Sequence, residues 1–95
     1  MSLKFEWDRD KAEANFEKHG VSFEHAASVF ADPLAALFLD EGHSGKEVRE
    51  ILIGNSTQGR LLLISFTERG GAIRIISARQ ATKRERRDYE QRPIG

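Results

Sequence analysis

The chain has 95 residues, its fifteen Lys or Arg residues are balanced by fifteen Asp or Glu, and it contains no cysteine. This length predicts a single domain over residues 1–95. The lack of cysteine excludes disulfides, thiolate zinc sites and a thiol nucleophile. The longest apolar run, residues 34–39, is far shorter than the roughly 20 residues that a membrane helix needs. Nothing in the sequence marks the chain for export or for a membrane.

The charges are unevenly distributed along the chain. Residues 1–59 hold six Lys or Arg against eleven Asp or Glu, whereas residues 60–95 hold nine against four. A basic segment of this kind suits contact with nucleic acid or with an acidic partner. The same distribution would also arise if the acidic part folded against the basic part, so both interpretations stay open.

The chain begins with a predicted strand and helix. Residues 4–7 alternate polar and apolar side chains, which predicts a short edge strand with Phe5 and Trp7 on one side. Asp8 follows as the N-cap of a helix, and Gly20 ends that helix in a left-handed conformation. The stripe that this helix is expected to bury carries Ala12, Phe16 and His19, with Asn15 beside it.

A second helix follows at once over residues 23–31, with Ser22 as its N-cap and Asp32-Pro33 as its end. Its buried stripe is expected to hold Phe23, Ala26, Ala27 and Phe30. Residues 34–40 then predict a strand, with a further helical turn over residues 34–37 as the alternative, and residues 41–46 predict a loop.

The most regular part of the chain predicts a β-hairpin. Two apolar runs flank Glu68-Arg69-Gly70-Gly71, where consecutive glycines supply the positive φ angles of a tight turn. We therefore expect residues 61–67 and 72–79 to pair as antiparallel strands. Alternation predicts a core face with Leu62, Ile64 and Phe66 beside Ile73 and Ile75, and a second face with Ser65 and Thr67 beside Arg74.

The elements on either side of the hairpin complete the predicted fold. Residues 48–54 predict a strand, and its alternation is expected to place Arg49, Ile51 and Ile53 on the core side with Ile64. Residues 81–91 predict a charged helix that packs either weakly or against a partner, opened by a capping box at Thr82 and Glu85. The order predicts an α+β domain: an antiparallel sheet of about four to five strands, two N-terminal helices and one C-terminal helix, with the helices on one side.

Familiar metal and nucleotide motifs are missing from the sequence. The three histidines lack zinc-like spacing, and Asp8 and Asp10 are explained by helix capping. No serine occupies a glycine-flanked elbow between strand and helix, and no P-loop lysine follows Gly70-Gly71. We therefore expect no metal ion and no cofactor.

Metal-free chemistry on a phosphodiester is what the remaining residues allow. Cleavage of RNA through its own 2′-hydroxyl needs a base, an acid and fixed cations near the phosphate. Arginine forks pair well with oxyanions, and four of them are expected to converge around one hollow beside the hairpin: Arg60, Arg69, Arg74 and Arg79. Alternatively, these arginines are solubilising charges at strand ends.

The acid–base candidates are Lys18, His19 and Glu47, which would meet the arginines if the end of the first helix overlay the hairpin. Each also has a purely structural interpretation. Lys18 suits a solvated cation at a helix end, His19 a core histidine, and Glu47 a surface ion pair with Arg49. His25 and His43 are interpreted as surface and loop residues.

Together, several segments resemble the BrnT family, the toxins of a class of bacterial type II toxin–antitoxin pairs. The resemblance covers residues 5–90 and rests on FEWDRDKAEANFEKHGVSFEHAASVFADP, HSGKEVR, GRLLLISFTER and RIISARQATKRERRDYE. It implies a RelE-like fold and a cytoplasmic, metal-independent endoribonuclease that inhibits translation. It also implies a BrnA-like antitoxin that neutralises the toxin and supplies DNA binding, so that operator DNA is contacted only through the complex.

The family's pattern is matched at Lys18, His19, Gly20, His43, Glu47, Arg49, Arg60, Thr67, Arg69, Arg74, Ser77 and Arg79. Under the leading hypothesis Arg74 and Arg79 bind the scissile phosphate, and either Glu47 or Lys18-His19 transfers protons. The other RNA contacts are expected from Arg49, Arg60, Thr67, Arg69 and Tyr89. The alternative hypothesis is a non-catalytic interaction module that binds an antitoxin or helps a complex to contact DNA.

Overall fold

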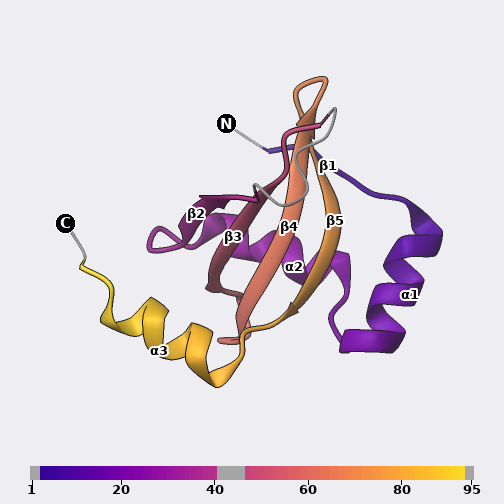
Figure 1. Cartoon of the computed structure of the whole chain (residues 1–95). Coiled ribbons are helices and arrows are strands. Elements are labelled where there is room, and N and C mark those ends of the chain that lie inside the picture. The colour runs from indigo at the N-terminus through magenta and orange to yellow at the C-terminus, as the bar shows by residue number, and fades with distance from the viewer. Residues whose placement is uncertain (1–2, 41–46, 94–95) are drawn as a thin grey trace.

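The computed structural model describes residues 3–40 and 47–93, so the expected loop at residues 41–46, with His43, lies outside the described residues. Figure 1 shows a twisted sheet with helices around it. In chain order the elements are β1 (Phe5–Glu6), α1 (Arg9–His19), α2 (Phe23–Ala27), the 3₁₀ helix η1 (Ser28–Ala31), β2 (Ala36–Leu39), β3 (Glu50–Asn55), β4 (Leu61–Arg69), β5 (Ala72–Gln80) and α3 (Lys83–Gln91).

The sheet has five strands in the order β1-β5-β4-β3-β2. The four strands from β2 to β5 pair antiparallel, but β1 runs parallel to β5, with Phe5 opposite Ile73. The sheet is therefore mixed, and the prediction of an antiparallel sheet is wrong at β1. No tight turn joins β1 to its neighbour, because α1, α2 and three strands lie between them in the chain, so its direction is free of the hairpin constraint.

The β4–β5 hairpin is confirmed. Gly70 and Gly71 have φ angles of 58° and 82°, and the strands extend to Arg69 and Ala72 on either side of this two-residue turn. Thr67 stands opposite Arg74 as expected. A β-bulge then leaves Ile76 unpaired between Ile75, which faces Phe66, and Ser77, which faces Ser65.

We call the side of the sheet that carries Thr67, Arg74, Ser77 and Arg79 the arginine face, and the opposite side the helix face. The helix face holds the core, in which side chains of the sheet pack against α2, η1 and the residues before them. The fully or almost fully buried members are Val21, Phe23, Ala26, Val29, Leu62, Ile64, Ile75 and Ala78.

The register of β3 differs from the prediction. Leu52, not Ile53, stands opposite Ile64, so Ile51, Ile53 and the preceding Arg49 are directed toward the arginine face rather than the core. The sequence suggests a turn of four residues, 56–59. Instead the Ser56 N–H donates to the Arg60 carbonyl, so the chain reverses over residues 57–59. A change of one residue in the turn moves every side chain of the strand to the other face.

The helix ends agree with the sequence signals. Asp8, Ser22 and Thr82 each accept a backbone N–H three residues on, and the capping box between Thr82 and Glu85 is complete. Gly20 ends α1 with a φ of 69°. The predicted second helix is divided into α2 and η1, because its last turn narrows to 3₁₀ geometry.

One stripe prediction is wrong. Phe16 is 56% exposed, whereas Asn15 beside it is buried. The reason is that α1 packs against the edge of β5, which β1 covers only at Ile73 and Arg74. Further along this edge, the Asn15 amide donates to the Ala78 carbonyl at 2.8 Å and accepts the Ala78 N–H at 3.1 Å. Asn15 thus takes the place of a neighbouring strand.

The expectation that all helices lie on one side is also wrong. Helix α3 lies over the arginine face, where Glu85 bonds Arg79 and where Tyr89 borders a pocket floored by Ile53 and Leu63. As expected, the helix packs weakly, since none of its residues is buried. It follows β5 after a link of only two residues, and the ion pair from Arg79 draws it to this side.

We predict that Asn15→Ala destabilises the fold by about 2–4 kcal/mol, because it removes three hydrogen bonds and leaves buried backbone groups of Val21 and Ala78 unpaired. Urea unfolding followed by circular dichroism measures the effect. Asn55→Ala is the matched control, since Asn55 is exposed, and its change should stay within about 0.5 kcal/mol. Equal effects for both variants would contradict the role assigned to Asn15.

Candidate active site

A group of charged side chains gathers on the arginine face near the turn of the β4–β5 hairpin. We call it the hairpin cluster and define it as Glu6, Glu47, Arg49, Arg69 and Arg74. These side chains come from β1, from the segment before β3, and from β4 and β5. The sheet brings together residues up to 68 positions apart in the sequence.

Arg74 projects from β5 directly beside its partner in β1. The two strands align Arg74 with Glu6, and Arg74 Nη1 donates to Glu6 Oε2 at 2.8 Å. The two side chains are 28% and 40% exposed. This pair fixes the guanidinium on the sheet surface while leaving part of it accessible to a ligand. The sequence did not indicate Glu6, because nothing in the pattern predicts that β1 is parallel to β5.

Arg69, the last residue of β4, bonds the carboxylate of Glu47. This hydrogen bond is the main reason why the pKa of Glu47 lies below its usual value, and the charges of Arg69, Arg49 and Arg74 lower the pKa further. The pKa of Arg69 is correspondingly raised, mainly by its bond to Glu47. The hairpin cluster therefore acts as one electrostatic unit in which Glu47 is ionised at neutral pH.

A pocket of about 510 Å³ opens beside this unit, lined by Glu47, Val48, Glu50, Thr67, Glu68 and Arg69. Thr67 is only 2% exposed, and its hydroxyl donates to the Val48 carbonyl at 2.8 Å. Its observed contact is thus structural: it holds the segment that carries Glu47 and Arg49 against β4.

Arg79 lies on the same face but is held by α3. Its two terminal nitrogens donate to the two carboxylate oxygens of Glu85 at 2.8 and 2.9 Å. The pKa of Glu85 falls to about 2, first because of this hydrogen bond and further because the Thr82 backbone N–H also donates to it. One carboxylate therefore caps α3 and fastens it to the sheet.

The far end of α3 is fastened by Tyr89. Its hydroxyl donates to the Leu34 carbonyl at 3.1 Å, and the Arg92 guanidinium lies 3.8 Å from the centre of its ring. Between α3 and the sheet lies a pocket of about 530 Å³ with an apolar floor made by Ala36, Phe38, Ile51, Ile53 and Leu63. Helix α3 thus partly covers the β2–β3 side of the arginine face.

Arg60, Lys18 and His19 lie at the other end of the sheet. Arg60 precedes the first residue of β4, whereas Arg69 is its last, and Arg60 Nη1 approaches the carbonyl of Gly20, which ends α1. The expectation that four arginines converge around one hollow is therefore wrong, as is the expected meeting of Lys18-His19 with Glu47. The hydrogen bonds of Asn15 to Ala78 hold α1 beside the part of β5 farthest from the turn.

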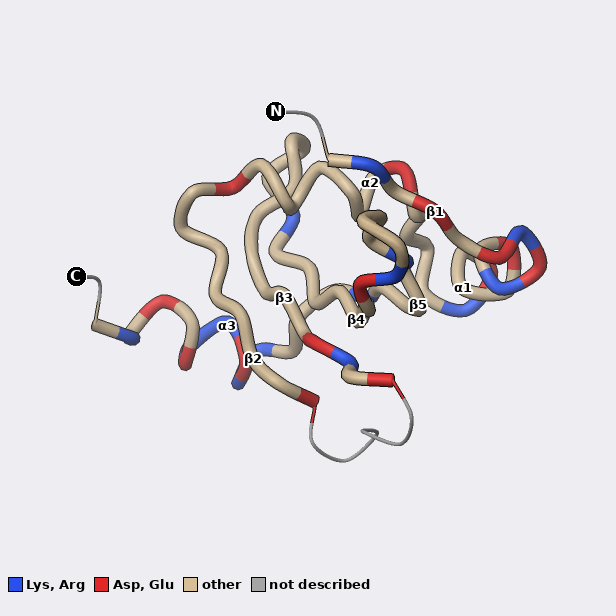
Figure 2. Tube along the Cα trace, turned by 90° about the horizontal axis from the view of Figure 1, so that it is seen from above, with Lys and Arg blue, Asp and Glu red and all other residues tan. Residues whose placement is uncertain are grey.

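Three arginines of the arginine face, Arg69, Arg74 and Arg79, each have a carboxylate partner. Two of these pairs, Arg74 with Glu6 and Arg69 with Glu47, join the basic part of the chain to the acidic part. The folding of one part against the other therefore accounts for some of the charge asymmetry. Figure 2, which views the trace from above, shows acidic and basic positions interspersed along it.

The described residues add two findings about sites. No group of three or more His, Asp or Glu side chains in this part of the chain is arranged to hold a metal ion, and none of its helices is long and apolar enough to cross a membrane.

His25 is half-buried, and its Nε2 lies 2.7 Å from the Ser56 hydroxyl, so it links α2 to the β3–β4 turn.

Comparisons with known proteins agree with this architecture. A family model described as "Ribonuclease toxin, BrnT, of type II toxin-antitoxin system" matches residues 7–85. The crystal structure of the Brucella abortus ribonuclease toxin BrnT is similar over 86% of this chain and 100% of that chain, with a TM-score of 0.66 and 26% sequence identity. No curated protein matches the sequence.

The ion pair between Arg79 and Glu85 predicts a dependence of stability on acid. Because the pKa of Glu85 is lower in the folded chain than the usual 4.5, its contribution is present above pH 4.5 and is lost as the pH falls toward about 2. We expect Glu85→Gln to flatten the fall in melting temperature over this interval. Glu90→Gln, which changes an exposed carboxylate of the same helix, should leave the wild-type slope. Identical slopes for the wild type and Glu85→Gln would contradict the assignment.

Proposed function

Since the chain belongs to the BrnT family of ribonuclease toxins of type II toxin–antitoxin systems, we propose that it is an endoribonuclease that cleaves RNA at the hairpin cluster without a metal ion. The observation that supports this site is the coupling of Arg69, Arg74 and Glu47 on an accessible part of one sheet face. Fixed cations beside an ionised carboxylate are what 2′-hydroxyl attack on a phosphodiester requires.

In this proposal Arg74 and Arg69 bind the scissile phosphate. Glu6 and Glu47 hold the two guanidinium groups in place before RNA arrives, and the phosphate then replaces these carboxylates. The exchange costs little, because partly exposed ion pairs contribute only about 0–1 kcal/mol. Once bound, the guanidinium groups face the extra negative charge that develops as the pentacoordinate phosphorane forms.

Glu47 is the proposed general base. When a phosphate engages Arg69, Glu47 loses the hydrogen bond that most lowers its pKa and gains a neighbouring negative charge. Both changes raise its pKa and make it a better acceptor for the proton of the attacking 2′-hydroxyl. The 2′-oxygen bonds to phosphorus, the 5′-oxygen leaves, and the leaving oxygen takes a proton from water. Lys18 and His19 have no part in this proposal, because they lie at the opposite end of the sheet.

The remaining candidates are assigned secondary roles. Arg49 lies beside Glu47 and is proposed to contact the RNA backbone. Arg79 and Tyr89 would join the RNA path only if α3 gave up its bonds to Arg79 and the Leu34 carbonyl. Thr67 supports the site through Val48, and Arg60 is too far along β4 to bind the same phosphate as Arg69.

The family also supports a cellular role. We propose that the protein acts in the cytoplasm, that RNA cleavage inhibits translation, and that a BrnA-like antitoxin neutralises it. Operator DNA would be bound only by the complex with this antitoxin. Under the rival hypothesis the chain is a non-catalytic module. The same arginines then bind an antitoxin or help a complex to contact DNA, and no RNA is cleaved.

The first test is cleavage of a labelled RNA by purified protein in excess EDTA. We expect the wild type to cut, and Arg74→Ala and Glu47→Gln to lose roughly 100-fold or more of the rate. Lys11→Ala removes an exposed cation from α1 and should cut like the wild type. Circular dichroism checks that all variants are folded. Full activity of a folded Arg74→Ala, or cleavage that requires added magnesium, would refute the proposed site.

A second test separates the enzyme from the interaction module. We expect expression of the wild type alone in a bacterial host to arrest growth and to stop incorporation of labelled amino acids within minutes. Arg74→Ala should be harmless at an equal protein level, since it lacks the phosphate-binding group. If both proteins arrested growth, toxicity through binding would be favoured. If neither the wild type nor Arg74→Ala arrested growth, the toxin proposal would be refuted.

A further inference from the structure

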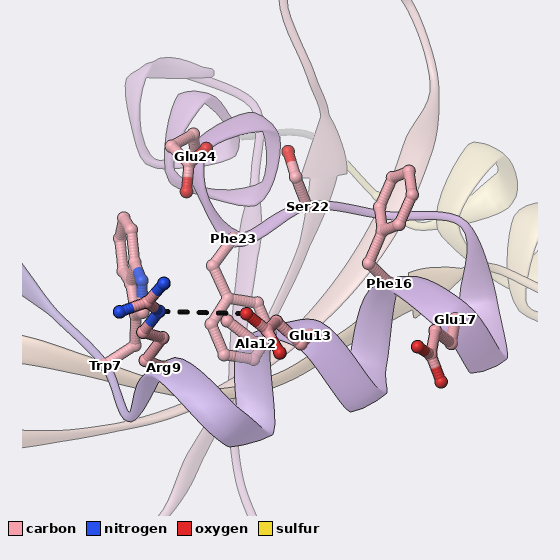
Figure 3. A pocket seen from close by; sticks show the side chains of 9 residues that line it. All are labelled: Trp7, Arg9, Ala12, Glu13, Phe16, Glu17, Ser22, Phe23 and Glu24. Carbon is pink, nitrogen blue, oxygen red and sulfur yellow. Dashed lines mark ion pairs between the residues drawn. The ribbon is translucent and has the colours of Figure 1, made fainter.

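A groove of about 380 Å³ lies between α1 and the start of α2 and shares no residue with the hairpin cluster (Figure 3). The proposed function does not use it. Its walls combine aromatic rings with carboxylates, and the carboxylates have no role in packing the core. Figure 3 shows Trp7 and Phe16 toward opposite ends of the groove, with Phe23 between them.

The aromatic walls are partly anchored and partly exposed. Phe23 is fully buried and holds Trp7 in an edge-to-face contact, with ring centroids 5.9 Å apart and an interplanar angle of 76°. Phe16 makes no ring contact of this kind with the residues that the structure describes, and it is 56% exposed. A large exposed ring at one end of the groove and a half-buried tryptophan at the other leave apolar surface available to another molecule.

The rim of the groove is acidic. Glu13 and Glu17 come from α1 and Glu24 from α2, with Arg9 as the single cation among the lining residues. Arg9 approaches Glu13 at 3.7 Å (dashed in Figure 3). Glu17 and Glu24 form no ion pair within residues 3–40 and 47–93. Two uncompensated carboxylates beside aromatic rings repel RNA and attract a cation.

We propose that this groove binds a basic segment of a protein partner, in which an arginine or lysine alternates with aliphatic residues. The cation would reach Glu17 or Glu24 while its stem lies on the ring of Trp7 or Phe16. The aliphatic neighbour would cover Phe16. Charge complementarity selects a cationic occupant, and the exposed ring selects one that also brings apolar side chains, which a small polyamine does not.

Trp7 provides a direct readout, because it is the only tryptophan in the chain. The probe is a blocked tetrapeptide that alternates leucine and arginine, titrated into the full chain while tryptophan fluorescence is recorded. The comparison ligands are the same peptide with glutamine in place of arginine, and spermidine. We expect the arginine peptide to change the fluorescence saturably and to bind at least about fivefold more tightly than either comparison ligand.

Variants of the groove residues test whether the peptide binds in the groove. The double change Glu17→Gln and Glu24→Gln should weaken the arginine peptide about fivefold or more, and Phe16→Ala should weaken it as well. Asp10→Asn with Glu90→Gln removes the same charge from exposed positions that line neither the groove nor the pocket beside the hairpin cluster and should leave binding within twofold. RNA cleavage by each variant is measured in parallel and should be unchanged, so this test is independent of the catalytic proposal.

Any one of several results would overturn the inference. Absence of a fluorescence change, or equal weakening in the two double variants, would show that the groove does not select a cation. Equal affinity for spermidine or for the glutamine peptide would exclude a basic, apolar protein segment as its ligand. Self-association of the wild type that the Glu17→Gln and Glu24→Gln changes abolish would assign the groove to a second copy of the chain.

Discussion

The pairing of β4 with β5 is the constraint on which the candidate site depends. Arg74 and Arg79 are an odd number of positions apart, so a regular strand would direct them to opposite faces of the sheet. The bulge at Ile76 adds one residue to β5 and restores both arginines to the same face. The tight turn at Gly70-Gly71 sets the register from which this follows. Without this register, β5 could not place Arg74 beside β1 and Arg79 beneath α3 on the same face.

Ion pairs then decide how the arginine face is used. Arg74 and Arg69 are each held by a single, partly exposed carboxylate, so a phosphate can replace it at small cost. Arg79 is held by both oxygens of Glu85, which also caps α3. The face is therefore divided into an accessible end near the turn and an end that α3 partly covers. This division explains why we assign catalysis to the hairpin cluster alone.

The distribution of charge also separates two surfaces. The hairpin cluster gathers arginines on the sheet, whereas the groove between α1 and α2 gathers carboxylates around Trp7 and Phe16. Nucleic acid and a basic protein segment would be attracted to different parts of the same small domain. A neutral total charge is thus compatible with contacts of opposite sign, since each surface acts over about a Debye length, roughly 8–10 Å at physiological salt.

Local signals in the sequence were sufficient for the element order, the caps at Asp8, Ser22 and Thr82, and the glycine turn of the hairpin, because each depends on residues only a few positions apart. The family resemblance could also be recognised from the sequence, since it rests on motifs in a fixed order. Tertiary structure alone decided that β1 is parallel, that Ile51 and Ile53 lie on the arginine face, that α3 crosses this face, and that Lys18-His19 lie far from Glu47. Those outcomes depend on one-residue changes of register and on contacts between distant segments, such as Asn15 with Ala78, which no short sequence pattern encodes.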